Sequence, residues 1–420
     1  MKFTLVIMAL VCLTPQQAIS DELDRELQRY VQMFKYEAIE RPEGVDQNKY
    51  VLGKNLFFDT RLSGNKNVSC ATCHDPSKGT GDGLPLPVGV TKETIIPRNS
   101  PALFNLDHYE LGSLFWDGRV SYDDMAEVYD TPSEVLNGYY PKRLDITEAL
   151  GSALAAQAIF PIISHEEMRG KKGTNPIADA KTDEQAWSQI MKRLLAIEEI
   201  KNLFKKAYPG QNINIGHLGN ALAEFQRVEF NSRNTPWDRY LRGELNALTP
   251  GEKRGAIVFS TVGRCTKCHD GALLGGRVFA NIASPQIGPG KDIVNNDEGR
   301  FYVTKRGVNK YQFRTPPLRN VALTAPYFHS GAYETLEDVI EHYTKGVGAI
   351  DEFDSGWLSK FESTIYGQRL FVETNPYKLF KKKENAHPLM RNKMIRLSSQ
   401  EKRDLIKFLK FSLTDTKFKR

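Results

Sequence analysis

The chain has 420 residues, of which 40% are hydrophobic and 26% are charged, and its formal net charge at pH 7 is +6. This length is sufficient for two ordinary domains, and the composition excludes a disordered or low-complexity chain. The mild charge excess lacks the dense basic patches of a nucleic-acid-binding protein, so we expect no nucleic acid among the partners.

The N-terminus has the pattern of an export signal. Lys2 precedes a short apolar run, and residues 18–20 form a small-x-small cleavage site. No segment of the chain reaches the ~20 apolar residues that a membrane-spanning helix needs. We therefore predict a signal peptide at 1–20, a mature chain that begins near Asp21, and a periplasmic location. A lipoprotein anchor at Cys12 is the alternative, and the large residue before that cysteine disfavours it.

Helical patterns dominate the rest of the chain. In chain order, helices are predicted from Glu22 to about Lys35 and at 147–160, 183–208, 215–230, 335–343 and 398–413. A further helix is predicted to begin at Thr249, with Pro250 at its first position and Glu252 at its third, because this is a capping-box arrangement. Two segments rich in Gly and Pro, 82–102 and 271–317, are predicted to be loops.

The four cysteines that follow the signal segment all lie in two copies of one motif, "CATCH" at 70–74 and "CTKCH" at 265–269. This is the attachment signature of c-type haem. Two thiols form thioethers with the vinyl groups of a porphyrin, and the adjacent histidine binds the iron from one side. We therefore predict two covalently bound c-type haems. The residues that hold them are Cys70, Cys73 and His74 for the first, and Cys265, Cys268 and His269 for the second.

Two other uses of a Cys-x-x-Cys pair fit less well. A four-cysteine zinc site usually has its pairs about 15–20 residues apart, whereas these pairs start at Cys70 and Cys265. A thioredoxin-like dithiol does not need the histidine and lies beside a βαβ pattern, which the sequence does not have.

The positions of the two motifs predict the domain organisation. The expected fold class is mainly α, with two cytochrome c-type haem domains and long loops. We assign the first domain to 21–245 and the second to 246–420, which includes a C-terminal extension.

Several motifs together resemble the bacterial dihaem cytochrome c peroxidase and MauG family. They occur in the family's order over most of the mature chain: "NVSCATCHDP", "PRNSPALFN", "FWDGR", "AQAIFPIISHEEM", "RCTKCHDG" and "FRTPPLRNVALTAPYFHSGAYETLEDVIEHY". The resemblance implies a first haem that reacts with hydrogen peroxide and a second haem that relays electrons. The chain departs from the short peroxidases by an additional segment at 121–150, which we expect to alter the rim of the active site or a partner surface.

The resemblance implies three catalytic residues. Trp116 matches the tryptophan that lies between the haems and bridges electron transfer, although a lone tryptophan would be interpreted as a packing residue. Gln157, Pro161 and Glu167 keep the family's spacing on the peroxide side of the first haem. Glu167 matches the carboxylate that moves the peroxide proton. The alternatives are a solvated surface glutamate, or the same role for its neighbour Glu166.

A calcium site is also implied. Asn99, Thr324 and Pro326 fall on the family's calcium positions between the two domains. Amide and backbone carbonyl oxygens are suitable ligands for this hard cation, so we expect one Ca²⁺. Without the resemblance, Asn99 would be an ordinary turn residue.

The loop that follows the first motif bears on the first haem. Many peroxidases of this family have a histidine there that caps the first iron, but "LPLPVGVTKETIIPRN" contains none, and His108 lies beyond it. We therefore expect the first haem to keep an open position for peroxide.

The position fourteen residues after His329 bears on the second haem. The peroxidases have methionine there, whereas this chain has Tyr343, as MauG-type proteins do. A phenolate favours oxidised iron, and a thioether favours reduced iron. The alternative is that Tyr343 only packs in its helix and that Met390 or Met394 is the ligand.

These features predict an exported dihaem c-type peroxidase that uses hydrogen peroxide. Its electrons come either from a small cytochrome c or cupredoxin, or from side chains of a partner protein, as in MauG. Tyr343 and the missing histidine favour the second source. A dihaem electron carrier without peroxidase activity is the alternative, but such a carrier has no need of Gln157 or Glu167. The sequence gives no oligomeric state.

Overall fold

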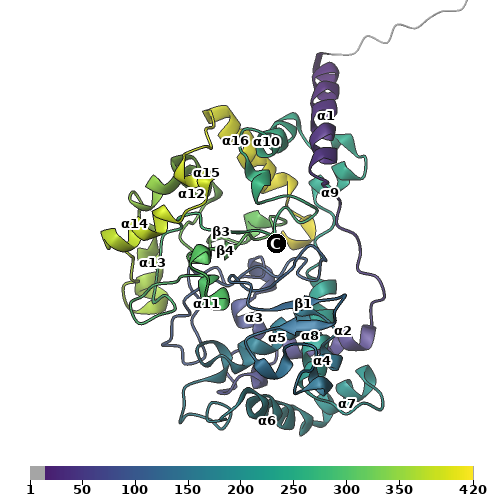
Figure 1. The fold of residues 1–420 in the computed structure, drawn as a ribbon. Coiled ribbons are helices and arrows are strands. Elements are labelled where there is room, and N and C mark those ends of the chain that lie inside the picture. The colour runs from purple at the N-terminus through teal and green to yellow at the C-terminus, as the bar shows by residue number, and fades with distance from the viewer. Residues whose placement is uncertain (1–14, 420) are drawn as a thin grey trace, which may run out of the picture.

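The computed structural model describes the backbone of residues 15–419 and the side chains of residues 22–419. The predicted signal segment 1–20 lies largely outside this range. Helices connected by long loops make up most of the structure, as Figure 1 shows, and this confirms the prediction of a mainly α fold.

The α-helices fall into two groups along the chain. The N-terminal helix and the helices of the first half are α1 (Pro15–Met33), α2 (Gln47–Phe57), α3 (Cys70–Cys73), α4 (Leu144–Leu150), α5 (Ala153–Ile163), α6 (Asp183–Leu195), α7 (Glu198–Ala207) and α8 (Ile215–Glu229). The helices of the second half are α9 (Pro236–Leu241), α10 (Pro250–Ser260), α11 (Phe301–Thr304), α12 (Leu336–Lys345), α13 (Ser359–Phe361), α14 (Pro376–Glu384), α15 (Pro388–Arg391) and α16 (Ser399–Lys407).

The described β-structure consists of two short antiparallel pairs. β1 (Ser121–Asp123) pairs with β2 (Val128–Asp130), and β3 (Phe279–Ala280) pairs with β4 (Phe313–Arg314). The first pair is a hairpin within the additional segment 121–150, and it brings Tyr122 and Tyr129 to a ring-centroid distance of 4.4 Å.

Two main hydrophobic cores correspond to the two halves of the chain. The first is built from α2 and α4 to α8, and the second from α9, α10, α12 and α16. The N-terminal helix α1 belongs to the second core, because Leu27 packs there and Tyr36, just after the helix, hydrogen-bonds to Ser260 at 3.1 Å. In Figure 1, α1 accordingly lies beside α10 although it is the first helix of the chain.

The same kind of helix crossing occurs in each core. A Cβ at Gly53 of α2 would overlap the backbone carbonyl of Ala221 in α8, and a Cβ at Gly255 of α10 would overlap that of Asp404 in α16. In both pairs the next close atom is the Cβ of a phenylalanine four residues later, Phe225 or Phe408. Each haem motif therefore follows a helix that approaches its partner closely at a glycine.

Several predicted helix boundaries differ from the structure. The sequence predicts one helix over 147–160, but α4 ends at Leu150. Gly151 follows it with a φ of 73°, and Ser152 caps α5. The segment 183–208 is likewise divided into α6 and α7 at residues 196–197. The start of α10 agrees with the prediction, since the Thr249 hydroxyl accepts from the Glu252 N–H and the Glu252 carboxylate accepts from the Thr249 N–H.

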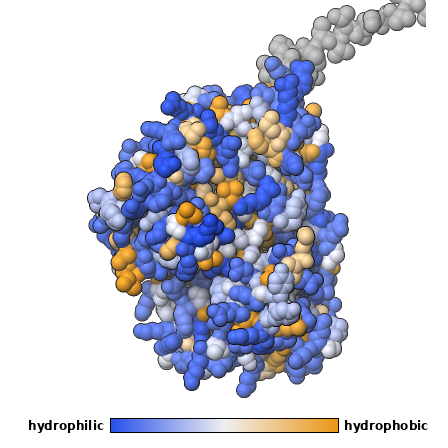
Figure 2. Space-filling model, in the orientation of Figure 1, coloured by the Kyte–Doolittle hydropathy of each residue, from blue (hydrophilic) through white to orange (hydrophobic). Residues whose placement is uncertain are grey.

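None of the helices in the described part of the chain is long and apolar enough to span a membrane by itself. Only α4 and α5 together meet the length and hydropathy requirements, and they are bent by 120° at the break between them. On the face shown in Figure 2, hydrophobic residues are scattered in small groups among hydrophilic ones.

Candidate functional site

The first Cys-x-x-Cys-His motif opens into a cavity of about 1240 Å³ in the first half of the chain. The motif forms the short helix α3, whose start is fixed by the Ser69 N–H donating to Thr72 Oγ1 at 2.9 Å. Its residues that line the cavity are Cys70, Cys73 and His74.

The ring of His74 is oriented as an iron ligand requires. Its Nδ1 lies 3.0 Å from the Thr80 carbonyl oxygen. A carbonyl only accepts, so Nδ1 carries the proton and Nε2 keeps a free lone pair. Burial lowers the pKa of His74, which keeps the imidazole in the neutral form that binds metals.

The residues predicted on the peroxide side line the same cavity. Gln157 and Pro161 lie on α5, and Glu167 lies in the π-helical turn His165–Arg169 that follows it. The neighbour Glu166 instead approaches Lys291 at 3.6 Å and is 46% exposed. Of the two adjacent glutamates, Glu167 is therefore the one that lines the cavity.

The loop after the first motif also contributes to this cavity, through residues such as Pro87, Val88 and Ile96. Among the described residues that line it, His74 is the only histidine. His108 does not line it; its ring stacks on Tyr109 at a centroid distance of 4.5 Å.

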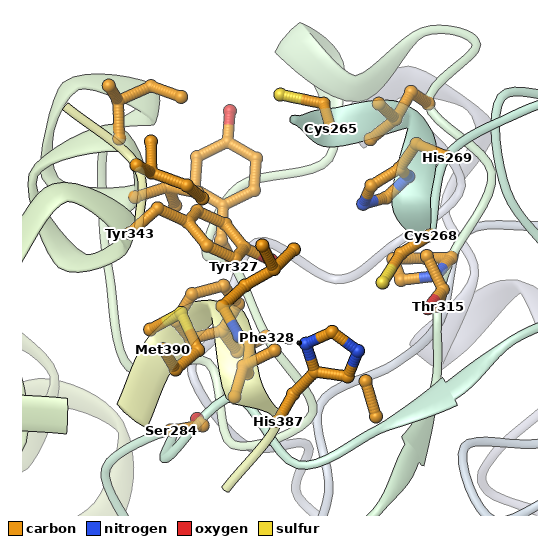
Figure 3. A pocket seen from close by; sticks show the side chains of 18 of the residues that line it. Cys265, Cys268, His269, Ser284, Thr315, Tyr327, Phe328, Tyr343, His387 and Met390 are labelled. Atoms are coloured by element: carbon orange, nitrogen blue, oxygen red, sulfur yellow. Dashed lines mark hydrogen bonds between the residues drawn. The ribbon is translucent and has the colours of Figure 1, made fainter. Parts of the chain in front are cut away.

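The second motif lies at a separate cavity of about 1410 Å³, which Figure 3 shows. Cys265, Cys268 and His269 lie on one side of it. The Nδ1 of His269 lies 2.8 Å from the Leu274 carbonyl oxygen, so its Nε2 is also the free nitrogen. Burial lowers the pKa of His269 to about 4, and this ring too is neutral.

The four thiols are poor candidates for redox or zinc chemistry. Burial raises the pKa of Cys70 and Cys265 to about 12 and that of Cys268 to about 11, and it also raises the pKa of Cys73. Thiolates are the reactive and metal-binding form of cysteine. The two pairs also line different cavities, which excludes a shared four-cysteine site.

Tyr343 lies on α12 and lines the second cavity on the side opposite the motif (Figure 3). Burial raises the pKa of its phenol well above the ordinary value, so ionisation requires a nearby cation such as a metal ion. Of the two alternative ligands, Met390 lines the cavity and is 1% exposed, whereas Met394 is 37% exposed and does not line it.

Trp116 lies between the two cavities, because it lines both of them. Its indole N–H donates to the Asn99 carbonyl at 2.8 Å, and its own carbonyl accepts from the Arg314 N–H at 2.7 Å. The ring also contacts that of His329 edge-on, at 6.4 Å between centroids. The indole is thus held from both halves of the chain.

A third cavity brings the predicted calcium residues together, since Asn99, Thr324 and Pro326 all line it. The Asn99 amide nitrogen donates to the carbonyls of Leu84 at 2.8 Å and Pro85 at 3.0 Å. This leaves Oδ1 as the side-chain atom that is available to a cation. An amide oxygen beside backbone carbonyls fits the oxygen preference of calcium.

Three side chains that line the second cavity have no role assigned from the sequence: Arg314, Lys382 and His387. Arg314 lies inside the family motif that begins at Phe313, so the sequence contained a signal that could have identified it. Lys382 and His387 come from α14 and the turn before α15, where the sequence shows no motif.

Comparisons with known proteins give the family. The profile of the di-haem cytochrome c peroxidase family matches residues 47–246. The cytochrome c551 peroxidase of Pseudomonas aeruginosa is 32% identical over 303 residues, which are 71% of this chain and 72% of that protein. The chain belongs to the dihaem cytochrome c peroxidase and MauG family.

Two further proteins that this dihaem peroxidase family member resembles are a MauG protein and a MauG-like protein. The methylamine utilization protein MauG of Methylorubrum extorquens is 31% identical over 316 residues, or 73% of each chain. The crystal structure of a MauG-like protein associated with microbial copper homeostasis has a TM-score of 0.61 and 26% identity, and covers 92% of this chain and 95% of that one.

The residues of both cavities fit the two c-type haems that family membership implies. Each cavity offers two neutral thiols and one histidine with a free Nε2. As a member of this family, the chain is an oxidoreductase that acts on peroxide.

Proposed function

We propose that this chain is an exported, periplasmic dihaem peroxidase of the MauG type, which reduces hydrogen peroxide with electrons taken from side chains of a partner protein. The observation that carries the proposal is Tyr343, which lines the second cavity opposite His269. A tyrosine oxygen at the second iron favours its oxidised state and suits an enzyme that withdraws electrons from a difficult donor.

Each haem is held, in this proposal, by its own motif. His74 would hold the haem iron of the first domain, 21–245, where peroxide would react. His269 and Tyr343 would hold the haem iron of the second domain, 246–420. When bound, the haem irons supply the electron-transfer and peroxide-reducing chemistry.

The side chains around the first cavity handle the substrate. Glu167 takes a proton from hydrogen peroxide and returns it to the departing oxygen, and Gln157 orients the substrate by hydrogen bonding. Each peroxide takes up two electrons and two protons and gives two molecules of water. Trp116 provides the path for electrons between the cavities, because it lines both.

Calcium at Asn99, Thr324 and Pro326 is part of the proposal. Its support is that these residues share one cavity and that Asn99 also accepts from Trp116 through its carbonyl. A cation there would stiffen the segment that holds the indole.

A peroxidase supplied by a small cytochrome c or cupredoxin is the second candidate. The similarity to the cytochrome c551 peroxidase favours it. A dihaem electron carrier is disfavoured, because Gln157 and Glu167 line the first cavity and a carrier needs neither.

The reaction of the as-isolated ferric protein with hydrogen peroxide tests the proposal. We expect it to react without prior reduction and to show one high-spin and one low-spin haem by EPR spectroscopy. Tyr343→Phe should abolish the low-spin signal, and Tyr343→Met should raise the reduction potential of that haem. Tyr327→Phe is the matched control, because Tyr327 lines the same cavity.

Two results would contradict the proposal. A low-spin signal that persists in Tyr343→Phe would assign the ligand elsewhere, with Met390 as the first candidate. A wild-type enzyme that reacts with peroxide only after uptake of one electron would be an ordinary electron-fed peroxidase.

A further inference from the structure

Arg314 is a buried cation that has no carboxylate partner. It is 4% exposed, it lines the second cavity, and no described carboxylate oxygen lies within 4 Å of its nitrogens. Its Nε donates to the Phe115 carbonyl at 3.1 Å, but Nη1 has no hydrogen-bond partner among the described residues. Burial alone lowers the pKa of Arg314 to about 10.

Lys382 is a second buried cation at the same cavity. It lies on α14 and is 5% exposed, and its Nζ donates to the Ser284 carbonyl at 2.9 Å. The ammonium lies 5.5 Å from the centroid of the Tyr311 ring. No described carboxylate lies within 4 Å of it. Burial lowers the pKa of Lys382 to about 8, although the more distant charges of Asp297 and Glu373 oppose this shift.

Two such cations in one cavity call for an anion. Removing a charge from water costs free energy unless an opposite charge replaces the lost hydration. His329 also lines the cavity and has an unpartnered Nε2, but burial lowers the pKa of His329 far below the ordinary value, so the ring is neutral. The buried charge therefore comes from Arg314 and Lys382, because Arg264, which also lines the cavity, is exposed to solvent.

We propose that Arg314 and Lys382 bind the propionate carboxylates of the porphyrin that is attached at Cys265 and Cys268. Thioether formation uses the vinyl groups of the porphyrin, so its two carboxylates remain ionised and need partners in the lining of the cavity. An arginine offers a planar pair of donors to a carboxylate, and a lysine offers a point charge. The inference rests on haem attachment at the second motif and is independent of the role of Tyr343.

The two cations differ in which haem cavities they line. Arg314 lines both haem cavities, whereas Lys382 lines only the second. Arg314 is also a positioning residue for Trp116, because its backbone N–H donates to the Trp116 carbonyl at 2.7 Å and its side chain to that of Phe115. Lys382 in turn gives α14 a role in setting the second haem's potential.

The charge-neutral variant Lys382→Met of the dihaem protein tests the proposal by redox titration and resonance Raman spectroscopy. A nearby cation favours the reduced haem, which has one positive charge fewer. We expect one of the two midpoint potentials to fall, and the Raman bending band of the propionates to shift as their hydrogen bonds weaken. Arg314→Met should lower both potentials, while Lys382→Arg should keep the wild-type values.

The neighbouring lysine is the matched control. Lys383 lies on the same helix, does not line the cavity and pairs with Asp351 at 2.8 Å. Lys383→Met therefore removes the same charge from α14 without touching the proposed site.

Lys382→Gln separates binding from a purely structural role, because it keeps a donor for the Ser284 carbonyl but no charge. We expect it to behave like Lys382→Met. The proposal is wrong if Lys382→Gln matches the wild type, if Lys382→Met matches Lys383→Met, or if the potential changes while the propionate band does not. None of these results would alter the peroxide reaction of the wild type, so they are distinct from a failure of the proposed function.

Discussion

Glu166 and Glu167 are adjacent in sequence but face different surroundings. The π-helical turn His165–Arg169 directs Glu167 to the first cavity and leaves Glu166 beside Lys291 at the exposed rim. A proton-transfer group has to be within reach of the substrate. Geometry therefore assigns the candidate acid–base role to Glu167 alone.

Glu167→Gln should slow the reaction with hydrogen peroxide by about 10²- to 10⁴-fold, which is the usual contribution of one acid–base group. Glutamine keeps the shape of the side chain but cannot take up the proton. Stopped-flow mixing of the ferric protein with peroxide measures the rate, and the haem spectrum shows that the cavity is intact. Glu166→Gln is the matched control and should react as the wild type does. Equal rates in both variants would remove Glu167 from the mechanism.

Sequence motifs were sufficient to find side chains that lie near one another in the chain or belong to a family pattern. Trp116, Gln157 and Tyr343 were all selected in this way, and all line the haem cavities. Lys382 could not be found, because it is one of three consecutive lysines. Its burial and its contacts with Ser284 and Tyr311, which are distant in the chain, distinguish it from its neighbours.

At the level of elements, local signals predicted helix starts better than helix breaks. The capping box at Thr249 is formed as expected, because all of its hydrogen bonds are within four residues. The break between α4 and α5 depends on Gly151 in a left-handed conformation and on Ser152 as the new cap. The alanine-rich composition of 147–160 concealed this break, since alanine favours a continuous helix.

The glycines at the two helix crossings depend on tertiary contacts that the sequence does not show. Gly255 of α10 has no room for a Cβ because the Asp404 carbonyl of α16 occupies that space. Gly251 lies one turn earlier, where a Cβ would meet the flexible side chain of Lys407 at 3.2 Å. A Gly-to-Ala substitution should therefore lower stability at Gly255 but not at Gly251, although both glycines lie in α10.

Gly255→Ala should destabilise the second half of the molecule by about 1–3 kcal/mol, as overpacking of a well-packed core does. Gly251→Ala should be neutral or slightly stabilising, because alanine is the better helix former by about 1 kcal/mol. Urea unfolding of the dihaem protein, followed through haem absorbance, measures both. Equal unfolding midpoints for the two variants would show that α10 and α16 do not pack closely at Gly255.

At the scale of the whole molecule, the two halves are joined beside Trp116 by a buried ion network. The Arg98 guanidinium binds Asp117 of the first half at 2.6 Å and Asp297 of the second half at 2.7 Å. Burial opposes the charge on all three groups, but their mutual attraction outweighs it. The pKa of Arg98 is therefore raised, and the pKa of each carboxyl is lowered.

The network also explains how the site between the cavities keeps its shape. Arg98 immediately precedes Asn99, whose carbonyl accepts from Trp116, and Asp117 immediately follows the indole. The charged side chains of Arg98 and Asp117 therefore lie beside Trp116, the proposed electron path. Arg98 is also next to Asn99, the candidate calcium ligand. Proton uptake by the carboxylates should loosen all three features together.

Acid should weaken the join between the halves in a predictable direction. Asp117 and Asp297 have a lowered pKa in the folded protein, so their contribution to stability is complete above the ordinary aspartate value of about 4. It is lost as the pH falls below that value towards the lowered one, because the unfolded chain takes up protons first.

Asp297→Asn should reduce stability at neutral pH and flatten the acid limb of a plot of unfolding free energy against pH. Asp351→Asn, at the exposed pair with Lys383, is the control and should leave the acid limb unchanged, since exposed ion pairs contribute little. An acid limb of the same slope in Asp297→Asn and the wild type would show that this network does not govern acid stability.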